Sequence, residues 1–275
     1  GGSLILGGST IPTTASTVAA PTLVTSGPLG TSDGVNAGRL LLGDGVTLQT
    51  DGTARTIAYP VAFVSAGASG FTMAGTAGLT LNGNIDLGAA ARSVTVSGAV
   101  SHVLGGEVFG TGSLVKAGTG TLVLGAANTF SGGMRVDAGV LQVGNDASLG
   151  SGSLTLANGV TVQTDGSARM LPNNVVFSNV DASAVTFGGV GNLTFNGQVD
   201  LGGATRTLTV PVLTTVVTLA GGVSGTGSLD KAGNGILDLV SANSFGGSLT
   251  LSGGITRVMA LGVWEGRTLR RPTWC

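Results

Sequence analysis

The stretch from Gly110 to Gly118, GTGSLVKAG, has the composition of a loop that could hold a phosphate group. A P-loop needs Lys directly after Gly and then Ser or Thr, because backbone N–H groups cradle the phosphates while the Lys and the hydroxyl reach phosphate and Mg²⁺. Here Lys116 follows Val115, Ala117 stands at the hydroxyl position, and the next residues, TLVLG, alternate like a strand. The sequence therefore does not predict a nucleotide site.

His102 is the only histidine and lies near Ser101 and Glu107 in the sequence, so an acid–base pair is conceivable. Its counterparts one repeat unit further along, as described below, are Val216 and Val217. His102 is thus no part of a repeated motif, and we interpret it as a histidine at the edge of a coil or in a loop.

Asp86 and Asp200 recur in the phrases IDLG and VDLG. An aspartate in such a phrase typically accepts nearby backbone N–H groups in a turn. Glycoside cleavage usually needs a pair of carboxylates, and neither aspartate has a second acid close in sequence. Aspartates stacked on one face of a β-helix could still assemble such a site, and a polysaccharide lyase or hydrolase is the alternative function.

The sequence does not predict a metal site, an internal disulfide or a nucleic-acid interface. Calcium-binding β-rolls need tandem nonapeptides with recurring aspartates, whereas GNDASLG (144–150) is isolated. One Cys and one His exclude an ordinary zinc site, and one Cys excludes an internal disulfide. Twelve Lys and Arg against thirteen Asp and Glu leave a net charge of −1 with no basic stripe for phosphate contacts. We expect no cofactor, no metal and no nucleic-acid partner.

The glycine-rich phrase is explained by a long internal repeat. Residues 225–247, GTGSLDKAGNGILDLVSANSFGG, repeat the phrase that begins at Gly110. The glutamines of LQTDGTAR (48–55) and VQTDGSAR (162–169) are 163 − 49 = 114 residues apart, and self-similarity over a long period is typical of a structural array. The predicted structural repeat positions are Gly112, Leu114, Lys116, Gly118, Asn128 and Phe130, matched by Gly227, Leu229, Lys231, Gly233, Asn243 and Phe245.

Short runs rich in Val, Leu, Thr and Ile, separated by Gly, Asn, Asp and Ser, predict strands and turns throughout both units. The 51 glycines and the lack of a helical apolar stripe predict almost no helix. With 4% aromatic residues, the chain fits a thin core of small apolar side chains, stacked as about a dozen coils of about 20 residues. Asn-Gly pairs at 82–83, 158–159 and 196–197 favour hairpins, so an antiparallel β-sandwich is the alternative fold.

The segment 112–152, GSLVKAGTGTLVLGAANTFSGGMRVDAGVLQVGNDASLGSG, resembles the strand repeat associated with autotransporter passenger domains, the secreted part of type V secretion proteins. The pattern is small-Leu-x-Lys-x-Gly-x-Gly-x-Leu-x-Leu, then Ala-Asn-x-aromatic-x-Gly-Gly, then Gly-x-Leu-x-Val-Gly-Asn. The resemblance implies a right-handed parallel β-helix (β-solenoid) on the surface of a Gram-negative cell, exported through a C-terminal membrane barrel that this chain does not contain.

We therefore expect a β-solenoid over 1–258, with a partial copy at 1–30 and units at 31–145 and 146–258. The segment 259–275 shows no repeat phrase, and a capping segment and an artefact of truncation or reading frame both remain open. No signal peptide is visible, and we interpret the chain as a fragment. The predicted function is a non-enzymatic surface scaffold that presents adhesive or effector regions. Its expected partners are host-cell, matrix or neighbouring-cell ligands, together with end-to-end self-association.

Two expectations concern side chains of the repeat. We expect Lys116 and Lys231 to lay their aliphatic stems along a coil edge with the ammonium group in water. We expect Phe130 and Phe245 to fill the interior, beside turns in which the asparagine side chains bond the backbone.

Overall fold

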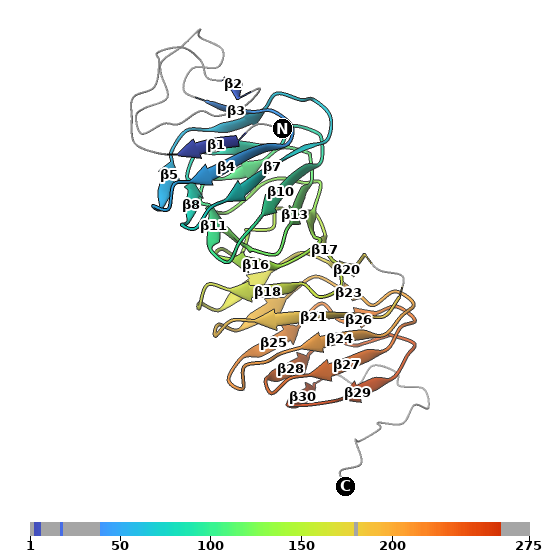
Figure 1. The fold of residues 1–275 in the computed structure, drawn as a ribbon. Helices are drawn as coiled ribbons and strands as arrows, with labels where there is room; N and C mark the ends of the chain where they lie inside the picture. The colour runs from blue at the N-terminus through green and yellow to red at the C-terminus, as the bar shows by residue number, and fades with distance from the viewer. Residues whose placement is uncertain (1–2, 7–16, 19–38, 179–180, 260–275) are drawn as a thin grey trace.

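A computed structural model describes residues 3–6, 17–18, 39–178 and 181–259, the first two of these segments by their backbone only. All strand pairs in the described residues are parallel, and each strand inside a sheet pairs with strands of the coils before and after it. The chain thus winds as a stack of coils with two sheets of ten strands running along it (Figure 1). The described residues contain no helix, and accordingly none that is long and apolar enough to cross a membrane. The expected parallel β-solenoid is confirmed.

Four sheets make up the walls. The first sheet contains β1 (Ser3–Leu6), β4 (Val46–Thr50), β7 (Ser69–Ala74), β10 (Arg92–Val96), β13 (Leu114–Ala117), β15 (Met134–Val136), β17 (Leu154–Leu156), β20 (Val175–Phe177), β23 (Val199–Asp200) and β26 (Val223–Ser224). The second contains β5 (Arg55–Ile57), β8 (Leu79–Leu81), β11 (Ser101–Leu104), β14 (Thr121–Leu124), β16 (Val140–Val143), β18 (Thr161–Thr164), β21 (Ser183–Gly188), β24 (Arg206–Thr209), β27 (Leu229–Ala232) and β29 (Leu249–Leu251).

The two shorter sheets have five strands each. The third sheet contains β2 (Thr17–Val18), β3 (Leu40–Leu42), β6 (Val61–Phe63), β9 (Ile85–Asp86) and β12 (Val108–Phe109). The fourth contains β19 (Arg169–Leu171), β22 (Leu193–Phe195), β25 (Val216–Leu219), β28 (Ile236–Leu239) and β30 (Ile255–Val258).

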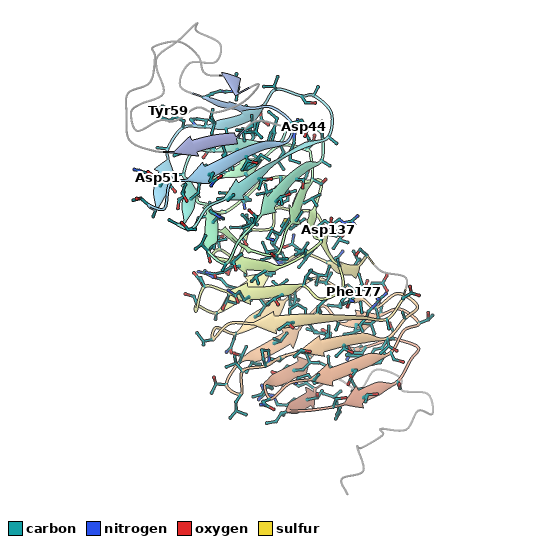
Figure 2. All side chains as sticks on the ribbon, in the orientation of Figure 1. Asp44, Asp51, Tyr59, Asp137 and Phe177 are labelled. Carbon is teal, nitrogen blue, oxygen red and sulfur yellow. The ribbon has the colours of Figure 1, made fainter. Side chains whose placement is uncertain are left out.

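Alternating side chains build the core. In β4 the residues Val46, Leu48 and Thr50 are buried while Thr47 and Gln49 between them are only partly buried, as expected when successive side chains point to opposite faces. Buried residues stack on buried residues in register, since Leu114 pairs with Met134 and Met134 with Leu154. Exposed polar side chains lie on the outside, as Asp51 does at the edge of the stack (Figure 2). A column of aliphatic side chains therefore fills the interior without many aromatic rings.

Coil length varies along the stack. Val46 pairs with Phe71, 25 residues on, whereas Thr121 pairs with Val140, only 19 residues on. The short coils coincide with the repeat phrase, because between β14 and β15 the segment that contains Asn128 and Phe130 forms no strand. The repeat phrase thus marks the coils that have two strands instead of three.

The alternative antiparallel sandwich is wrong. Asn158-Gly159 lies between β17 and β18, yet these strands belong to different sheets and do not pair with each other. The Asn158 side chain accepts a hydrogen bond from the Ala184 N–H at 2.8 Å, in the next coil, and Gly159 has φ +78°. The Asn-Gly pair therefore makes a corner of the coil, which uses the same left-handed glycine conformation as a hairpin turn.

Equivalent strands of the two repeat units lie in different sheets. Arg92 begins β10 in the first sheet, and Arg206, 114 residues later, begins β24 in the second. The same holds for β7 and β21. A motif that recurs in the sequence therefore appears on a different face of the stack.

Candidate functional site

The glycines of the repeat phrase allow successive coils to touch. A Cβ on Gly112 would lie 2.1 Å from the Ala90 carbonyl oxygen, and one on Gly227 would lie 2.1 Å from that of Ala204. Gly118 and Gly233 both have φ +75°, a conformation that L side chains rarely adopt. Since Leu114 and Leu229 are fully buried beside them, these positions hold the coil together.

The two repeat lysines are inside the stack, and the expectation that their ammonium groups lie in water is wrong. Lys116 and Lys231 have no exposed surface. Lys116 Nζ donates to the carbonyl oxygens of Ala117 at 3.0 Å, Gly118 at 2.7 Å and Ala138 at 3.0 Å. An ammonium group has three N–H donors, so all of them are used. Because Ala138 belongs to the next coil, each lysine links two coils.

Lys231 repeats this arrangement with the carbonyl groups of Ala232, Gly233 and Gly253, at 2.7, 2.9 and 3.2 Å. Burial lowers the pKa of Lys116 to about 8. Burial likewise lowers the pKa of Lys231 to about 8, with Asp230 acting in the opposite direction. The strand alternation itself carried this signal, since Lys116 lies two residues after the buried Leu114 and so faces the same side.

The Asn and Phe positions of the first copy behave as expected. Asn128 is buried, its Oδ1 accepts from the Val108 N–H at 2.7 Å, and its Nδ2 donates to the Ser148 carbonyl in the following coil. Phe130 is fully buried. The side chain of Asn128 thus replaces the strand pairing that the short coil lacks at this corner.

The second copy matches only in part. Asn243 is buried and its Oδ1 accepts from the Val223 N–H at 2.9 Å. Phe245 is partly buried and packs against the core. The prediction that it fills the interior therefore holds less well than for Phe130.

Two buried arginines were missed by the sequence analysis. Arg92 Nε donates to the Leu87 carbonyl at 2.9 Å, and its terminal nitrogens donate to the carbonyls of Gly67 at 2.6 Å and Ser65 at 2.8 Å, while the guanidinium lies 4.5 Å from the Phe63 ring centroid. Arg206 makes the corresponding contacts in the second unit: with the Leu201 and Asp181 carbonyls, the Ser183 hydroxyl and the Phe177 ring. The recurrence of arginine at the end of NIDLGAAAR and QVDLGGATR was the available signal.

His102 is a core residue, so its assignment to a coil edge or loop is wrong. It has no exposed surface, its Nδ1 accepts from the Leu79 N–H at 3.0 Å, and burial lowers its pKa. Ser101 points the opposite way and is exposed, and Glu107 instead accepts from the Thr129 hydroxyl at 2.6 Å. The three side chains form no acid–base pair.

The aspartates serve turns and ion pairs. Asp86 Oδ1 accepts from the Gly88 N–H at 2.8 Å and Asp200 Oδ1 from the Gly202 N–H at 2.8 Å, as the sequence predicted. Exposed Asp51 and Asp165 each pair with the arginine four residues on, and that arginine lowers the pKa of the carboxyl group. Within the described ranges, no three His, Cys, Asp or Glu side chains come together as a metal site.

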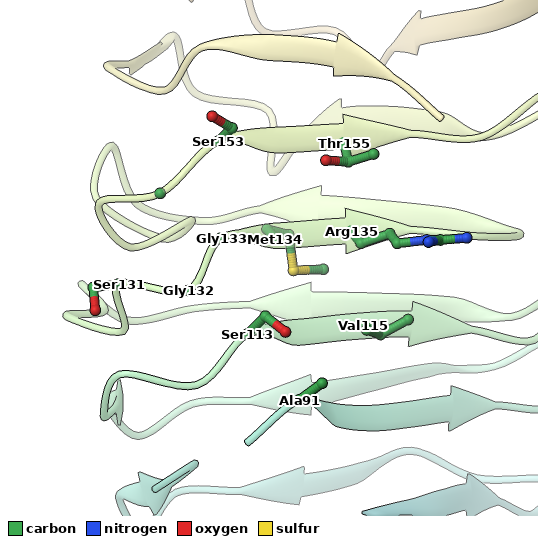
Figure 3. Close-up of a pocket in the computed structure, with 11 residues that line it drawn as sticks. Ala91, Ser113, Val115, Ser131, Gly132, Gly133, Met134, Arg135, Ser153 and Thr155 are labelled. Atoms are coloured by element: carbon green, nitrogen blue, oxygen red, sulfur yellow. The ribbon is translucent and has the colours of Figure 1, made fainter. Parts of the chain in front are cut away.

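The outer face of the first sheet carries an open groove of about 600 Å³ across β13, β15 and β17 (Figure 3). Its lining includes Ser113, Gly133, Arg135, Ser153 and Thr155, and no Asp or Glu. It lies at the short coils of the first repeat phrase. The groove is therefore a concave surface on this part of the repeat that is open to a ligand.

Comparison with known proteins now gives the family of the repeated coil. The family model described as passenger-associated-transport-repeat matches residues 114–143 and 229–258, which are the two segments with the buried lysines. The chain carries two passenger-associated-transport-repeats. The resemblance to the passenger strand repeat is therefore confirmed.

A curated relative extends the likeness beyond the repeat itself. The chain is 38% identical over 171 residues, 61% of its length, to the "Adhesin BmaC autotransporter" of Brucella suis biovar 1 (strain 1330). The matched part spans about 4% of the length of that relative. No solved structure matches the chain.

Proposed function

We propose that this chain is a non-enzymatic segment of the surface scaffold of an autotransporter passenger, which presents adhesive or effector regions outside a Gram-negative cell. The observation that carries the proposal is the parallel stack of the described residues, in which the buried lysines and arginines bond the backbone of their own and neighbouring coils. Lys116, for example, spends all its donors on carbonyl groups, and Arg92 bonds three carbonyl groups and the Ser69 hydroxyl. Such a stack can serve as an elongated spacer, because each coil contacts only its neighbours and adding coils lengthens the stack.

Two comparisons support the surface location and the adhesive role. The passenger-associated-transport-repeat model matches residues 114–143 and 229–258, and the relative from Brucella suis is named as an autotransporter adhesin. The ligands that we expect are carried by host cells, matrix or neighbouring cells. End-to-end association of the isolated segment belongs to the same proposal, and sedimentation velocity at rising concentration would detect it.

Surface exposure is tested with an epitope tag in the parent protein, inserted after Ser167 in the exposed loop 165–168. Antibody should stain intact cells as strongly as permeabilised cells. Staining that requires permeabilisation would overturn the surface location.

The absence of catalysis needs a separate experiment. Purified chain is incubated with a panel of neutral and acidic surface polysaccharides, and reducing ends and unsaturated products are measured. No release above buffer is expected, since no carboxylate lines the groove. Release that persists after repurification would show an enzyme instead.

A further inference from the structure

The groove on the first sheet contains a notch that follows from the stacking of three coils. Ser113, Gly133 and Ser153 directly precede Leu114, Met134 and Leu154, which pair in register, so the three occupy the same place in successive coils. The Leu114 N–H donates to the Gly133 carbonyl at 3.0 Å and the Met134 N–H to that of Ser153 at 2.9 Å, which confirms the alignment. Coils about 4.8 Å apart place the two serines about 10 Å from each other, with no side chain between them.

Gly133 keeps this notch open for a physical reason. It has φ +88°, and a Cβ on it would lie 2.9 Å from the Ser153 carbonyl oxygen. A side chain here would need both a strained backbone and a shift of the next coil. The notch is therefore built into the packing of the coils.

Arg135 lies two residues after Gly133, between Val115 and Thr155 of the neighbouring coils, and its side chain runs along the sheet away from the notch (Figure 3). Its side chain is 54% exposed. Nε donates to Asp137 Oδ1 at 2.5 Å, which fixes the guanidinium plane, and neither terminal nitrogen has a hydrogen-bond partner within residues 39–178 and 181–259. Arg135 thus offers a free pair of terminal N–H groups held in place by an aspartate.

The groove consequently presents hydroxyl donors and one guanidinium group, whose charge the Asp137 carboxylate partly offsets. A guanidinium group binds a carboxylate through two parallel hydrogen bonds, and serine hydroxyls both donate to and accept from hydroxyl groups. We propose that this groove binds an acidic surface glycan, with the carboxylate of one sugar unit on Arg135 and hydroxyl groups of neighbouring units on Ser113 and Ser153. A sugar site here goes beyond the scaffold role, because three adjacent coils would then form an adhesive surface in their own right.

The arrangement favours a glycan over an extended peptide. Peptides that add to a sheet need a strand edge with unpaired N–H and C=O groups. The strands β13, β15 and β17 are each paired on both sides, so no such edge is present at the groove. A sugar chain needs only side-chain donors and acceptors on the outer face.

The second repeat serves as an internal comparison. At the places of Val115, Gly133 and Arg135 it has Asp230, Ser248 and Thr250, so a carboxylate replaces an apolar residue and the positive charge is absent. The Ser248 N–H also donates to the Ser228 hydroxyl at 3.0 Å, which engages the residue equivalent to Ser113. The sugar site therefore belongs to the first repeat alone.

Isothermal titration calorimetry on the purified 275-residue chain tests the proposal. The probe is an oligosaccharide of glucuronic acid units, compared with the same oligosaccharide after reduction of its carboxyl groups to alcohols. We expect saturable binding of the acidic form and a loss of affinity of about tenfold or more for the reduced form and for Arg135→Gln. Thr155→Trp, which keeps the charge and fills the groove, should abolish binding.

Arg169→Gln is the matched control, because it breaks an arginine–aspartate pair at another site and should leave the affinity unchanged. Far-UV circular dichroism confirms that each variant is folded. The proposal is overturned if the acidic form does not bind, if both forms bind equally, if Arg135→Gln binds like the wild type, or if an oligoglutamate peptide binds as tightly as the sugar. None of these outcomes bears on the epitope-tag and polysaccharide tests, so the scaffold role stands or falls separately.

Discussion

Replacing Lys116 by Met asks whether a buried ammonium group stabilises the coil that contains it. Met keeps an unbranched stem of similar length, so the packing of the aliphatic part is largely retained. The change removes all three N–H donors and leaves the carbonyl groups of Ala117, Gly118 and Ala138 without this partner. The outcome depends on which is larger, the hydrogen bonds lost or the cost of burying the charge.

The magnitude follows from these two opposing effects. Hydrogen bonds to a charged group contribute about 1.5–3 kcal/mol each, so three contribute about 4.5–9 kcal/mol. Burial lowers the pKa from 10.5 to about 8, and a shift of that size corresponds to about 3.4 kcal/mol against the charged form. The hydrogen bonds thus stabilise the coil by more than burial of the charge destabilises it. We expect Lys116→Met to lower the free energy of unfolding by about 3 kcal/mol at pH 7.

Urea unfolding followed by far-UV circular dichroism measures this loss, expected as a fall in midpoint of about 1 M. Lys231→Met should cost less, because the third hydrogen bond of Lys231 is longer at 3.2 Å. Val103→Met, at a partly exposed outward position of β11, is the control and should change the free energy by less than about 0.5 kcal/mol. A Lys116→Met variant as stable as the wild type would refute the reasoning, since it would show that desolvation outweighs the carbonyl contacts.

The pH dependence offers a second check on the same residue. A lysine with a lowered folded-state pKa releases its proton from about pH 8 in the folded chain and only near 10.5 when unfolded. The unfolded state then holds more protons between these values, so the stability contributed by Lys116 rises across this window. The gap between wild type and Lys116→Met should therefore widen above about pH 8, and a constant gap would show that the carbonyl groups cancel the effect of burial.

Three further predictions concern neighbouring features. Acid should destabilise the chain as pH falls below about 6.5, because burial lowers the pKa of His102 and its Nδ1 must stay unprotonated to accept the Leu79 N–H. His102→Val should reduce this pH dependence of the free energy of unfolding, measured by urea titrations between pH 5 and 8. An unchanged pH dependence would contradict the role given to His102. Phe130→Ala should cost about 3–5 kcal/mol and Asn128→Ala about 1–2 kcal/mol, and midpoints equal to wild type in denaturation would mean that neither side chain holds the short coil. Gly112→Ala should have a much lower melting temperature than the wild type, because its Cβ would lie 2.1 Å from the Ala90 carbonyl oxygen. Gly159→Ala, whose Cβ would have no atom within 4 Å, should lower the free energy of unfolding by only about 1–2 kcal/mol because of its left-handed φ. Similar melting temperatures of the two variants would contradict the contact between coils at Gly112.

The fold class could be predicted from the sequence because its cause is local and repeated. Alternating short runs such as TLVL (121–124) fix which side chains face inward, and glycines between them supply the corners. The 114-residue repeat also favoured a stack over a sandwich, because in a stack two copies of the same sequence can pack against similar neighbouring coils. The turn roles of Asp86 and Asp200 were equally accessible, since each aspartate bonds an N–H only two residues away.

The buried titratable side chains could not be placed from the sequence in the same way. Lys116, Arg92 and His102 share the parity of buried neighbours in their strands, so alternation alone would have placed them inside. The general rule that charges stay in water led to the opposite assignment for the lysine. Only the tertiary structure shows why burial of the two cations is tolerated, because their acceptor carbonyls come from nearby turns and from a neighbouring coil, 22 residues away for Lys116 and 25 for Arg92.

The faces on which repeated motifs appear were likewise decided by the tertiary structure alone. A unit of 114 residues wound into coils of 19 to 25 residues does not close on a whole number of coils. Arg92 therefore falls in the first sheet and Arg206 in the second, although their contacts correspond. Sequence period fixes the contacts that each motif makes, but the accumulated length of the intervening coils fixes the direction in which the motif faces.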